Sequence, residues 1–327
     1  MARRPRGKYI DPTSTQIVHV VTRCVRGAYL CGRDNISKRS FEHRRSWIQD
    51  RLAFLAAEFG IDCLTFSVMS NHVHVILRSR PDVVRSWTDR EVAERWIKLC
   101  PNRDGALAPP EEVKRLLRLP EQIVEIRRRL SDVSWWMRLL TQSIARRANR
   151  EDGCTGRFWE GRFKAQILAD DAAILACTLY VDLNPIRATL ANSLQDASYT
   201  GAKVRLDAIR ARRNRNRTSS DSSTTWLCPI PIVRRSNTSG SAALGGNAQT
   251  RRKGFLQMSE VDYLRLADWT GRQARPDKRG HIPRSIRPVL ERLHIASDQW
   301  LEINRTFRSL FRKGSGIKIS NPSKIAA

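Results

Sequence analysis

Apolar and polar residues recur with two different periods along the first 80 residues of the chain. Residues 16–23 are rich in β-branched side chains, which predicts a strand. Over residues 40–59 the apolar side chains return at helical spacing, which predicts an amphipathic helix. Two apolar runs within residues 61–78 are joined by Ser70 and Asn71, which favour a turn, so this stretch predicts a hairpin. The order strand, helix, strand, strand is the beginning of a ferredoxin-like antiparallel α+β unit.

The pattern is mainly helical after the hairpin. Residues 82–150 contain three helical segments separated by Pro, Gly and Ser. Pro120 is expected to break or kink the second segment, because a proline inside a helix removes a hydrogen bond. A further helix is predicted over residues 171–183, and a helical pattern returns from Ser259 onward. The predicted fold is therefore an antiparallel sheet with helices, followed by a C-terminal helical extension.

The composition of the chain changes after about residue 205. Residues 210–217 are dominated by arginine and run into a Ser/Thr-rich stretch, which predicts a basic, flexible connector. The expected organisation is a basic arm (1–15), an α+β domain (16–205) with a helical insertion at about 82–150, a basic flexible linker (206–255), a helical C-terminal module (256–315) and a disordered tail (316–327).

The net charge of the chain indicates what class of partner it binds. The 59 Lys and Arg residues against 32 Asp and Glu give a formal net charge of +27 over 327 residues. A charge this large predicts a polyanionic partner, with nucleic acid ahead of an anionic membrane surface. No apolar run is long enough to span a bilayer, and no apolar signal region follows the basic N-terminus. Seven cysteines without a Cys-x-x-Cys pair indicate reduced thiols. We therefore expect a cytoplasmic protein with no membrane partner.

The second arm of the hairpin carries the most specific chemistry. His72 and His74 are two residues apart in a predicted strand, so their side chains project from the same face. Two neighbouring imidazoles present two neutral nitrogens to a metal ion. The alternative interpretation is that one or both histidines are structural residues of the strand.

A second stretch combines aromatic and basic residues. In strand periodicity, Trp159 lies on one face of residues 157–164, and Phe158, Arg162 and Lys164 lie on the other. Aromatic stacking together with cationic contacts is what a groove for single-stranded nucleic acid needs. The alternative is a core strand with a basic outer face.

The predicted helix over residues 171–183 contains Tyr180, which shares a face with three small residues. This leaves room for a substrate to approach the phenol. Asn184 follows four residues later, at or just past the helix end, because Pro185 disfavours helical geometry there. The alternative is a packing tyrosine whose hydroxyl bonds to the backbone.

Three blocks of the sequence together resemble those of the single-tyrosine HUH transposases, and in particular the REP-associated tyrosine transposases. They are Val68-Met-Ser-Asn-His-Val-His-Val-Ile-Leu77, Gly156-Arg-Phe-Trp-Glu-Gly-Arg-Phe-Lys164 and Tyr180-Val-Asp-Leu-Asn-Pro-Ile-Arg-Ala188. The resemblance covers roughly residues 15–200. It implies an HUH fold for residues 16–205 and leaves the role of the C-terminal extension open.

The resemblance also implies a mechanism. Tyr180 would attack a phosphodiester of single-stranded or hairpin DNA, leaving a 5′-phosphotyrosine link and a free 3′-hydroxyl, with no nucleotide cofactor. His72, His74 and Asn184 would hold Mg²⁺ or Mn²⁺. Strand transfer would reverse the cleavage. The residues expected to contact DNA are Arg157, Phe158, Trp159, Arg162, Lys164 and Arg187. A monomer or homodimer associated with the nucleoid is expected.

Two other functions remain open from the sequence. One is a transposase-derived DNA-binding protein that has lost catalysis and uses its histidines for structure. The other is a metal-dependent hydrolase, since His-x-His strands occur there too, although no further carboxylate or histidine ligand can be identified near the pair. No general base for Tyr180 is evident. Glu160 and Asp182 are candidates, but Asp182 points to the opposite side of a helix from Tyr180.

Overall fold

The structure is a computed structural model, and it describes residues 10–25, 29–34, 38–101, 110–214, 226–232 and 254–273. Most of the predicted basic arm, the tail and much of the predicted linker and C-terminal module lie outside these residues. The described end of the arm is packed rather than mobile. Ile10 is buried, and the Ser131 hydroxyl donates a hydrogen bond to the carbonyl of Pro12 at 3.2 Å.

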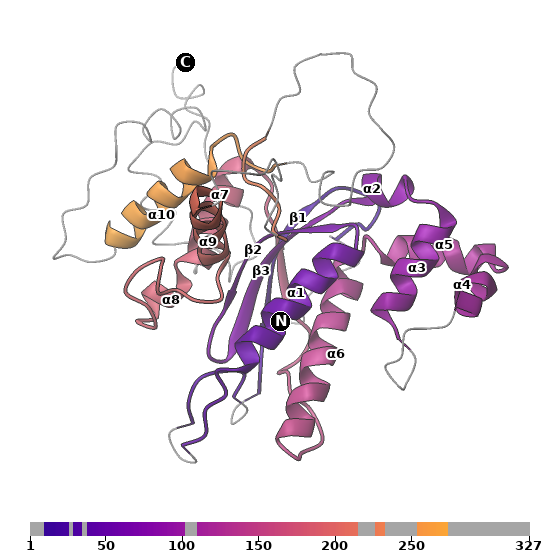
Figure 1. The fold of residues 1–327 in the computed structure, drawn as a ribbon, viewed down its shortest axis with the longest axis horizontal. Helices are drawn as coiled ribbons and strands as arrows, with labels where there is room; N and C mark the ends of the chain where they lie inside the picture. Colours follow the sequence, from indigo (N-terminus) through magenta and orange to yellow (C-terminus); the bar gives the residue numbers. More distant parts are fainter. Residues whose placement is uncertain are drawn as a thin grey trace, which may run out of the picture. The chain divides into compact units, whose positions relative to one another are not determined.

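Four strands form one sheet: β1 (Ile17–Arg23), β2 (Ile61–Val68), β3 (His72–Ser79) and β4 (Lys164–Ile167). Their order in the sheet is β2-β3-β1-β4 (Figure 1). β1 and β2 are consecutive strands, yet β3 separates them in the sheet, which is the split arrangement of a ferredoxin-like fold. The predicted α+β class, with an antiparallel sheet and helices, is confirmed.

The chain divides into two compact units, and the division runs through β2 and β3. The first unit comprises Met1–Cys63, Ser70–His72 and Leu77–Lys164, and the second comprises Leu64–Met69, Val73–Ile76 and Ala165–Ala327. No helix in the described ranges has both the length and the apolar character that a bilayer span requires.

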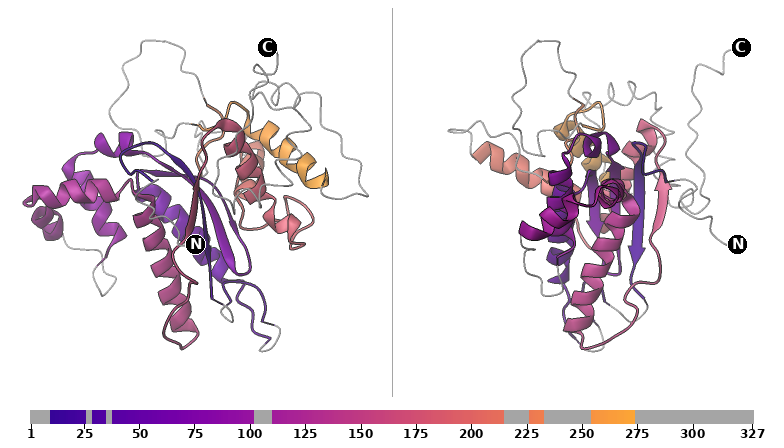
Figure 2. Two further views of the ribbon diagram at one scale, coloured as in Figure 1. Left: turned by 180° about the vertical axis from the view of Figure 1, so that it is seen from behind. Right: turned by 90° about the vertical axis from the view of Figure 1, so that its right-hand side faces the viewer.

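Two long helices of the first unit, α1 (Arg44–Glu58) and α6 (Val133–Glu151), run side by side (Figures 1 and 2). Arg44 is fully buried and joins them. Its guanidinium lies 2.7 Å from a carboxylate oxygen of Glu151 and also pairs with Asp152. A buried cation is stable only when its donors are satisfied, so these contacts fix the register of the two helices.

In the described residues of the predicted helical insertion, four short helices precede α6: α2 (Pro81–Arg85), α3 (Asp89–Leu99), α4 (Pro110–Leu117) and α5 (Pro120–Arg129). Thr88 and Glu91 form a capping box at the start of α3. Pro120 divides the second predicted segment as expected. It lies at the first position of α5, where the missing N–H costs nothing.

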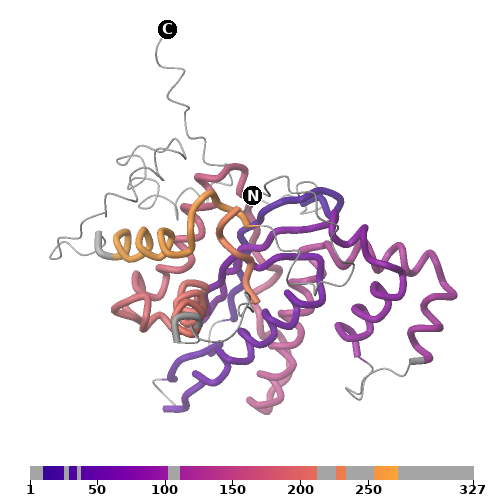
Figure 3. Tube along the Cα trace, turned by 45° about the horizontal axis from the view of Figure 1, so that its top comes forward, coloured from indigo at the N-terminus to yellow at the C-terminus, as the bar shows by residue number. Residues whose placement is uncertain are grey.

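The second unit contains the remaining helices: α7 (Asp171–Asp182), α8 (Asn184–Arg187), α9 (Gly201–Asn214) and α10 (Glu260–Gln273). α7 contacts α8, and α9 contacts α10, which is drawn in orange in Figure 3. The structure differs from the linker expected over 206–255, because α9 extends to Asn214. Leu227, Cys228 and Ile230 are buried, and a parallel bridge joins Pro231 to Leu256. The predicted helix after Ser259 is present as α10.

Candidate functional site

The hairpin turn between β2 and β3 is held by two backbone hydrogen bonds. The carbonyl of Asn71 accepts from the amide of Cys24, and the carbonyl of Ser70 accepts from the amide of Cys31, each at 3.0 Å. β3 begins immediately afterwards at His72. His72 and His74 therefore lie on the same face of one strand, as predicted. His74 is buried, with 5% of its surface exposed, and His72 is half-buried.

The ring of His72 is oriented by its neighbour. Its Nδ1 lies 2.7 Å from the side-chain oxygen of Asn71. An amide oxygen can only accept, so the hydrogen of the neutral ring belongs on Nδ1 and the lone pair on Nε2. Histidines that bind metals are commonly oriented in this way by an acceptor on the other ring nitrogen.

Tyr180 comes from α7, whose N-cap residue is Asp170. The carboxylate of Asp170 caps the helix by accepting from the amide of Ala173 at 2.7 Å. Residues 172–179 are all buried, whereas Tyr180 is half-buried. Its ring meets the ring of His74 edge-on, with 5.6 Å between centroids and 86° between planes. A phenol and an imidazole from distant parts of the sequence are thus in direct contact.

Asn184 and Arg187 follow on α8. α7 ends at Asp182 and α8 begins at Asn184, so the break expected before Pro185 is present. The guanidinium of Arg187 lies 5.8 Å from the centre of the Tyr180 ring. The side-chain nitrogen of Asn184 is buried and has no hydrogen-bond partner among the described residues. A buried amide in this state can bind a further polar group.

The next question is which side chains could bind the predicted metal ion. The described part of the chain contains no cluster of three or more His, Cys, Asp or Glu residues that could hold a metal ion. A divalent ion would therefore rely on imidazole and amide ligands. The orientation of His72 fits that chemistry, which suits Mn²⁺ better than the oxygen-seeking Mg²⁺. The unsatisfied atom of Asn184 is a nitrogen that donates hydrogen bonds, so only the oxygen of this amide could bind the ion.

The expected stacking surface over residues 157–164 is corrected by the structure. Phe158 and Trp159 are buried, with 4% and 8% of their surfaces exposed, and their rings contact each other at 5.0 Å. The indole nitrogen of Trp159 donates to the carbonyl of Thr141 at 2.9 Å. The regular strand β4 begins only at Lys164, and before it Trp159 pairs with Cys24 in an isolated antiparallel bridge. Neither can stack on a base in this conformation.

The structure also shows where the basic side chains of the same stretch lie. Arg157, Arg162 and Lys164 are all exposed. They remain candidates for contacts with phosphate groups, which bind cationic side chains without stacking.

Asp182 is not the general base for Tyr180. It is completely buried, and its carboxylate accepts hydrogen bonds from the hydroxyl of Thr65 at 2.6 Å and from Tyr263 at 2.5 Å. Burial raises the pKa of Asp182, and these hydrogen bonds act in the opposite direction. Burial and the charge of Asp182 together raise the pKa of Tyr263 well above its usual value. No local pattern indicates these partners of Asp182, because they come from distant segments of the chain.

His19 belongs to β1, and its side chain is buried. Only 1% of its surface is exposed, and burial lowers its pKa to about 3. The ring is therefore neutral at physiological pH.

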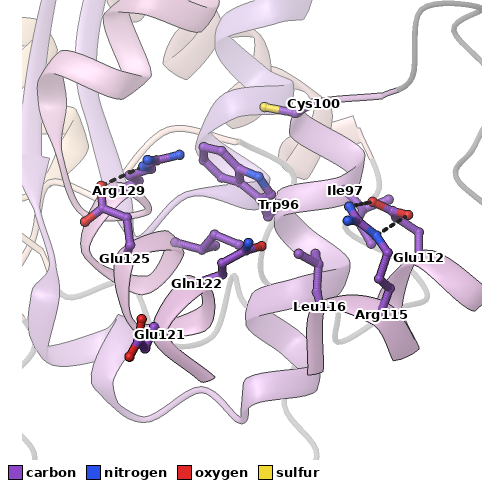
Figure 4. Close-up of a pocket in the computed structure, with 11 residues that line it drawn as sticks. Trp96, Ile97, Cys100, Glu112, Arg115, Leu116, Glu121, Gln122, Glu125 and Arg129 are labelled. Atoms are coloured by element: carbon purple, nitrogen blue, oxygen red, sulfur yellow. Dashed lines mark hydrogen bonds and ion pairs between the residues drawn. The ribbon is translucent and has the colours of Figure 1, made fainter. Parts of the chain in front are cut away.

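A cavity of about 490 Å³ lies among α3, α4 and α5 (Figure 4). Trp96, Ile97 and Leu116 supply apolar surface. Arg115 pairs with Glu112 and Arg129 with Glu125, so the cations that line the cavity are already matched by carboxylates. None of the predicted site residues lines it.

Comparison with known proteins adds a single likeness. No protein-family model and no curated protein matches the chain. A solved structure of a REP-associated tyrosine transposase bound to a REP hairpin is similar over 74% of this chain and 99% of that chain. The identity is 10% and the TM-score is 0.35. A likeness at this TM-score carries no inference about activity, which has to come from the side chains themselves.

Proposed function

We propose that the chain is a metal-dependent transposase that cleaves and rejoins single-stranded DNA through a 5′-phosphotyrosine intermediate, at hairpin or palindromic elements. The observation that carries this proposal is the contact between Tyr180 and His74. It joins a potential nucleophile to a potential metal ligand, as the predicted mechanism requires. The REP-associated tyrosine transposases, which the sequence blocks resemble, are the kind of enzyme proposed.

The reaction exchanges one phosphate ester for another. The phenol oxygen of Tyr180 forms a bond to phosphorus, and the bond between phosphorus and the 3′-oxygen breaks. The phenol loses its proton, and the departing 3′-oxygen gains one. Because the number of ester bonds is unchanged, no nucleotide is consumed. Rejoining follows when a 3′-hydroxyl attacks the phosphotyrosine link.

Two features of the chain assist this chemistry. A phenol is a weak nucleophile at neutral pH, and a cation beside it favours the phenolate. Arg187 supplies such a cation, since its guanidinium lies over the Tyr180 ring at 5.8 Å. The same group can bind the phosphate on which negative charge develops.

His72, His74 and Asn184 are the proposed ligands of Mn²⁺ or Mg²⁺. Such an ion, when bound, would neutralise charge on the scissile phosphate and help to orient it. The contribution of the protein is a set of neutral ligands, which leaves the positive charge of the ion available to DNA. The orientation of the His72 ring by Asn71 supports this assignment.

The net charge supports DNA as the partner. A formal charge of +27 favours binding to a polyanion, and Arg157, Arg162 and Lys164 are exposed in the stretch that precedes α7. We propose that these three side chains contact the phosphate backbone of the substrate.

The decisive experiment traps the covalent intermediate. Full-length protein is incubated with Mn²⁺ or Mg²⁺ and single-stranded oligonucleotides that form hairpins, labelled at the 3′ end, because the tyrosine keeps the downstream fragment. Denaturing electrophoresis should show a labelled protein band, and mass spectrometry should place the modification on Tyr180. Tyr180→Phe should bind the oligonucleotides but form no adduct. Tyr29→Phe is the matched control, since Tyr29 stacks on Phe41 instead, and should react normally.

The same experiment separates the other functions. A protein that only binds DNA would shift the oligonucleotides without cutting them. A metal-dependent hydrolase would release cut DNA that carries no protein. Either result with the wild-type protein would refute the proposed transposase.

A further inference from the structure

A buried carboxylate lies behind the proposed nucleophile. Asp182 is two residues after Tyr180 on α7, so the two side chains project about 160° apart around the helix axis. Tyr180 faces His74, whereas Asp182 is completely buried on the opposite side. The helix that carries the phenol is therefore held from its rear face.

Three separate segments converge on this carboxylate. The Thr65 hydroxyl of β2 donates to one oxygen at 2.6 Å, and the backbone amide of Ala202, at the start of α9, donates to the same oxygen at 3.1 Å. The hydroxyl of Tyr263 on α10 donates to the other oxygen at 2.5 Å. All three groups belong to the same compact unit as Tyr180. A carboxylate with these donors constrains both the rotation and the axial position of α7.

α10 is itself firmly anchored. Ser259 caps its start, accepting from the amide of Asp262 at 3.0 Å. In its first turn, Glu260 pairs with Arg205 at 3.1 Å, and Arg205 is fully buried. The Arg205 guanidinium also donates to the carbonyls of Leu64 at 2.7 Å and Cys228 at 2.8 Å. The beginning of α10 is thus tied to β2 and to the chain around residue 228.

A second contact of α10 lies about two turns beyond Tyr263. At Gly271, a Cβ atom would approach the side chain of Leu183 to 3.2 Å and that of Ile186 to 4.0 Å. Leu183 joins α7 to α8, between Tyr180 and Asn184, and Ile186 lies in α8. α10 therefore touches this junction closely as well as binding Asp182.

We propose that α10 is a positioning element for Tyr180 and acts through the hydrogen bond from Tyr263 to Asp182. This inference rests on the proposed function for its catalytic consequence. The tip of a helical side chain lies about 5–6 Å from the helix axis, so a rotation of about 10° moves it by about 1 Å. A misplacement of this size at a reacting group can cost about 100-fold in rate. Tyr263 is hydrogen-bonded to Asp182, two residues after the proposed nucleophile, and acts on it through the helix.

The test compares two full-length variants of α10. Tyr263→Phe keeps the ring and removes the donor to Asp182. Thr270→Val is the matched control, because the buried hydroxyl of Thr270 donates only along its own helix, to the carbonyl of Leu266 at 2.7 Å. Three quantities are measured for each: the single-turnover rate of adduct formation on a hairpin oligonucleotide with Mn²⁺, the affinity for that oligonucleotide, and hydrogen exchange in peptides covering residues 171–183.

Tyr263→Phe is expected to slow adduct formation by roughly 10- to 100-fold while leaving the affinity within about twofold of wild type. Exchange in α7 should accelerate by roughly tenfold. Thr270→Val should change none of the three quantities. A Tyr263→Phe variant with normal rate and normal exchange would overturn the proposal. The proposal would also be overturned if the reaction rates of Tyr263→Phe and Thr270→Val fell equally, in proportion to their loss of stability.

The exchange measurement keeps this inference separate from the proposed function. If wild-type protein forms no adduct, the proposed function fails, while faster exchange in Tyr263→Phe alone still supports α10 as the element that holds α7. Unchanged exchange overturns the inference. Should Tyr263→Phe not fold, Gly271→Ala provides the second variant, since its methyl group would press on Leu183. It should likewise slow the reaction and loosen α7.

Discussion

The imidazole of His74 and the phenol of Tyr180 meet edge-on, with ring centres 5.6 Å apart and planes at 86°. This geometry is one of the favourable arrangements of two aromatic rings, in which the edge of one faces the π surface of the other. It also brings a nitrogen heterocycle beside an oxygen nucleophile. The two rings can therefore contribute to folding and to chemistry at the same time, and mutations can separate the contributions.

His74→Phe and His74→Ala should separate packing from metal binding. His74→Phe keeps an aromatic ring against Tyr180 and should change the free energy of unfolding by less than about 1 kcal/mol, whereas His74→Ala should cost about 1–3 kcal/mol. Both remove the ring nitrogens, so both should abolish Mn²⁺ binding measured by electron paramagnetic resonance. Urea titrations measure the stability. Mn²⁺ binding that survives in both variants would refute His74 as a ligand.

Asn71→Ala tests the orientation of the His72 ring. Removing the amide oxygen that lies 2.7 Å from Nδ1 should let the ring change tautomer and orientation. The affinity for Mn²⁺, measured by isothermal titration calorimetry, should fall about 10- to 100-fold, as for other groups that orient metal-binding histidines. Asn71→Asp retains an acceptor and should bind the ion at least as well as wild type. Equal affinities in Asn71→Ala and wild type would contradict the role assigned to Asn71.

The local patterns of the sequence were sufficient for the hairpin and for α7. Two histidines at alternate positions of an apolar strand must share a face, so the placement of His72 and His74 followed from strand geometry alone. The end of α7 before Asn184 followed from Pro185. These features depend on residues within a few positions of one another, where backbone sterics dominate.

Other features depend on contacts that no local pattern contains. Phe158 and Trp159 were interpreted as members of a regular strand, but tertiary packing draws both into the core, and the strand begins at Lys164. The partners of Asp182 include Tyr263, which lies 81 residues further along the chain. A buried carboxylate needs donors, but the sequence does not indicate which residues provide them.

Trp159 should matter for stability rather than for base stacking. Trp159→Ala should lower the free energy of unfolding by about 3–5 kcal/mol, as expected for the loss of a large buried aromatic side chain. Trp159→Phe keeps an aromatic ring but removes part of the indole and its hydrogen bond to Thr141, so it should cost less than Trp159→Ala, about 2 kcal/mol. Denaturant unfolding followed by circular dichroism measures both. Normal stability together with a large loss of oligonucleotide affinity would restore the stacking interpretation.

Arg162 should act through phosphate contacts. For single-stranded DNA, each such contact contributes about 0.7 to the slope of log affinity against log salt concentration. Arg162→Ala should therefore reduce the magnitude of the slope by about 0.7, measured by fluorescence anisotropy between low and moderate salt. Arg90→Ala is a matched control on α3, where Arg90 is exposed and pairs with Glu94. Its slope should equal that of wild type, and an identical slope in Arg162→Ala would argue against the contact.

His19 should make the fold sensitive to acid. Burial lowers its folded-state pKa from 6.5 to about 3, so below pH 6.5 the unfolded chain binds a proton that the folded chain does not. Stability from this residue is complete above pH 6.5 and is lost progressively as the pH falls towards 3. Between pH 7.5 and 5.5 the expected loss is about 1.4 kcal/mol. His19→Leu should remove this part of the pH dependence in urea titrations at the two pH values, whatever its effect on stability at pH 7.5. An equal loss in wild type and His19→Leu would mean that the His19 ring is already protonated in the folded protein.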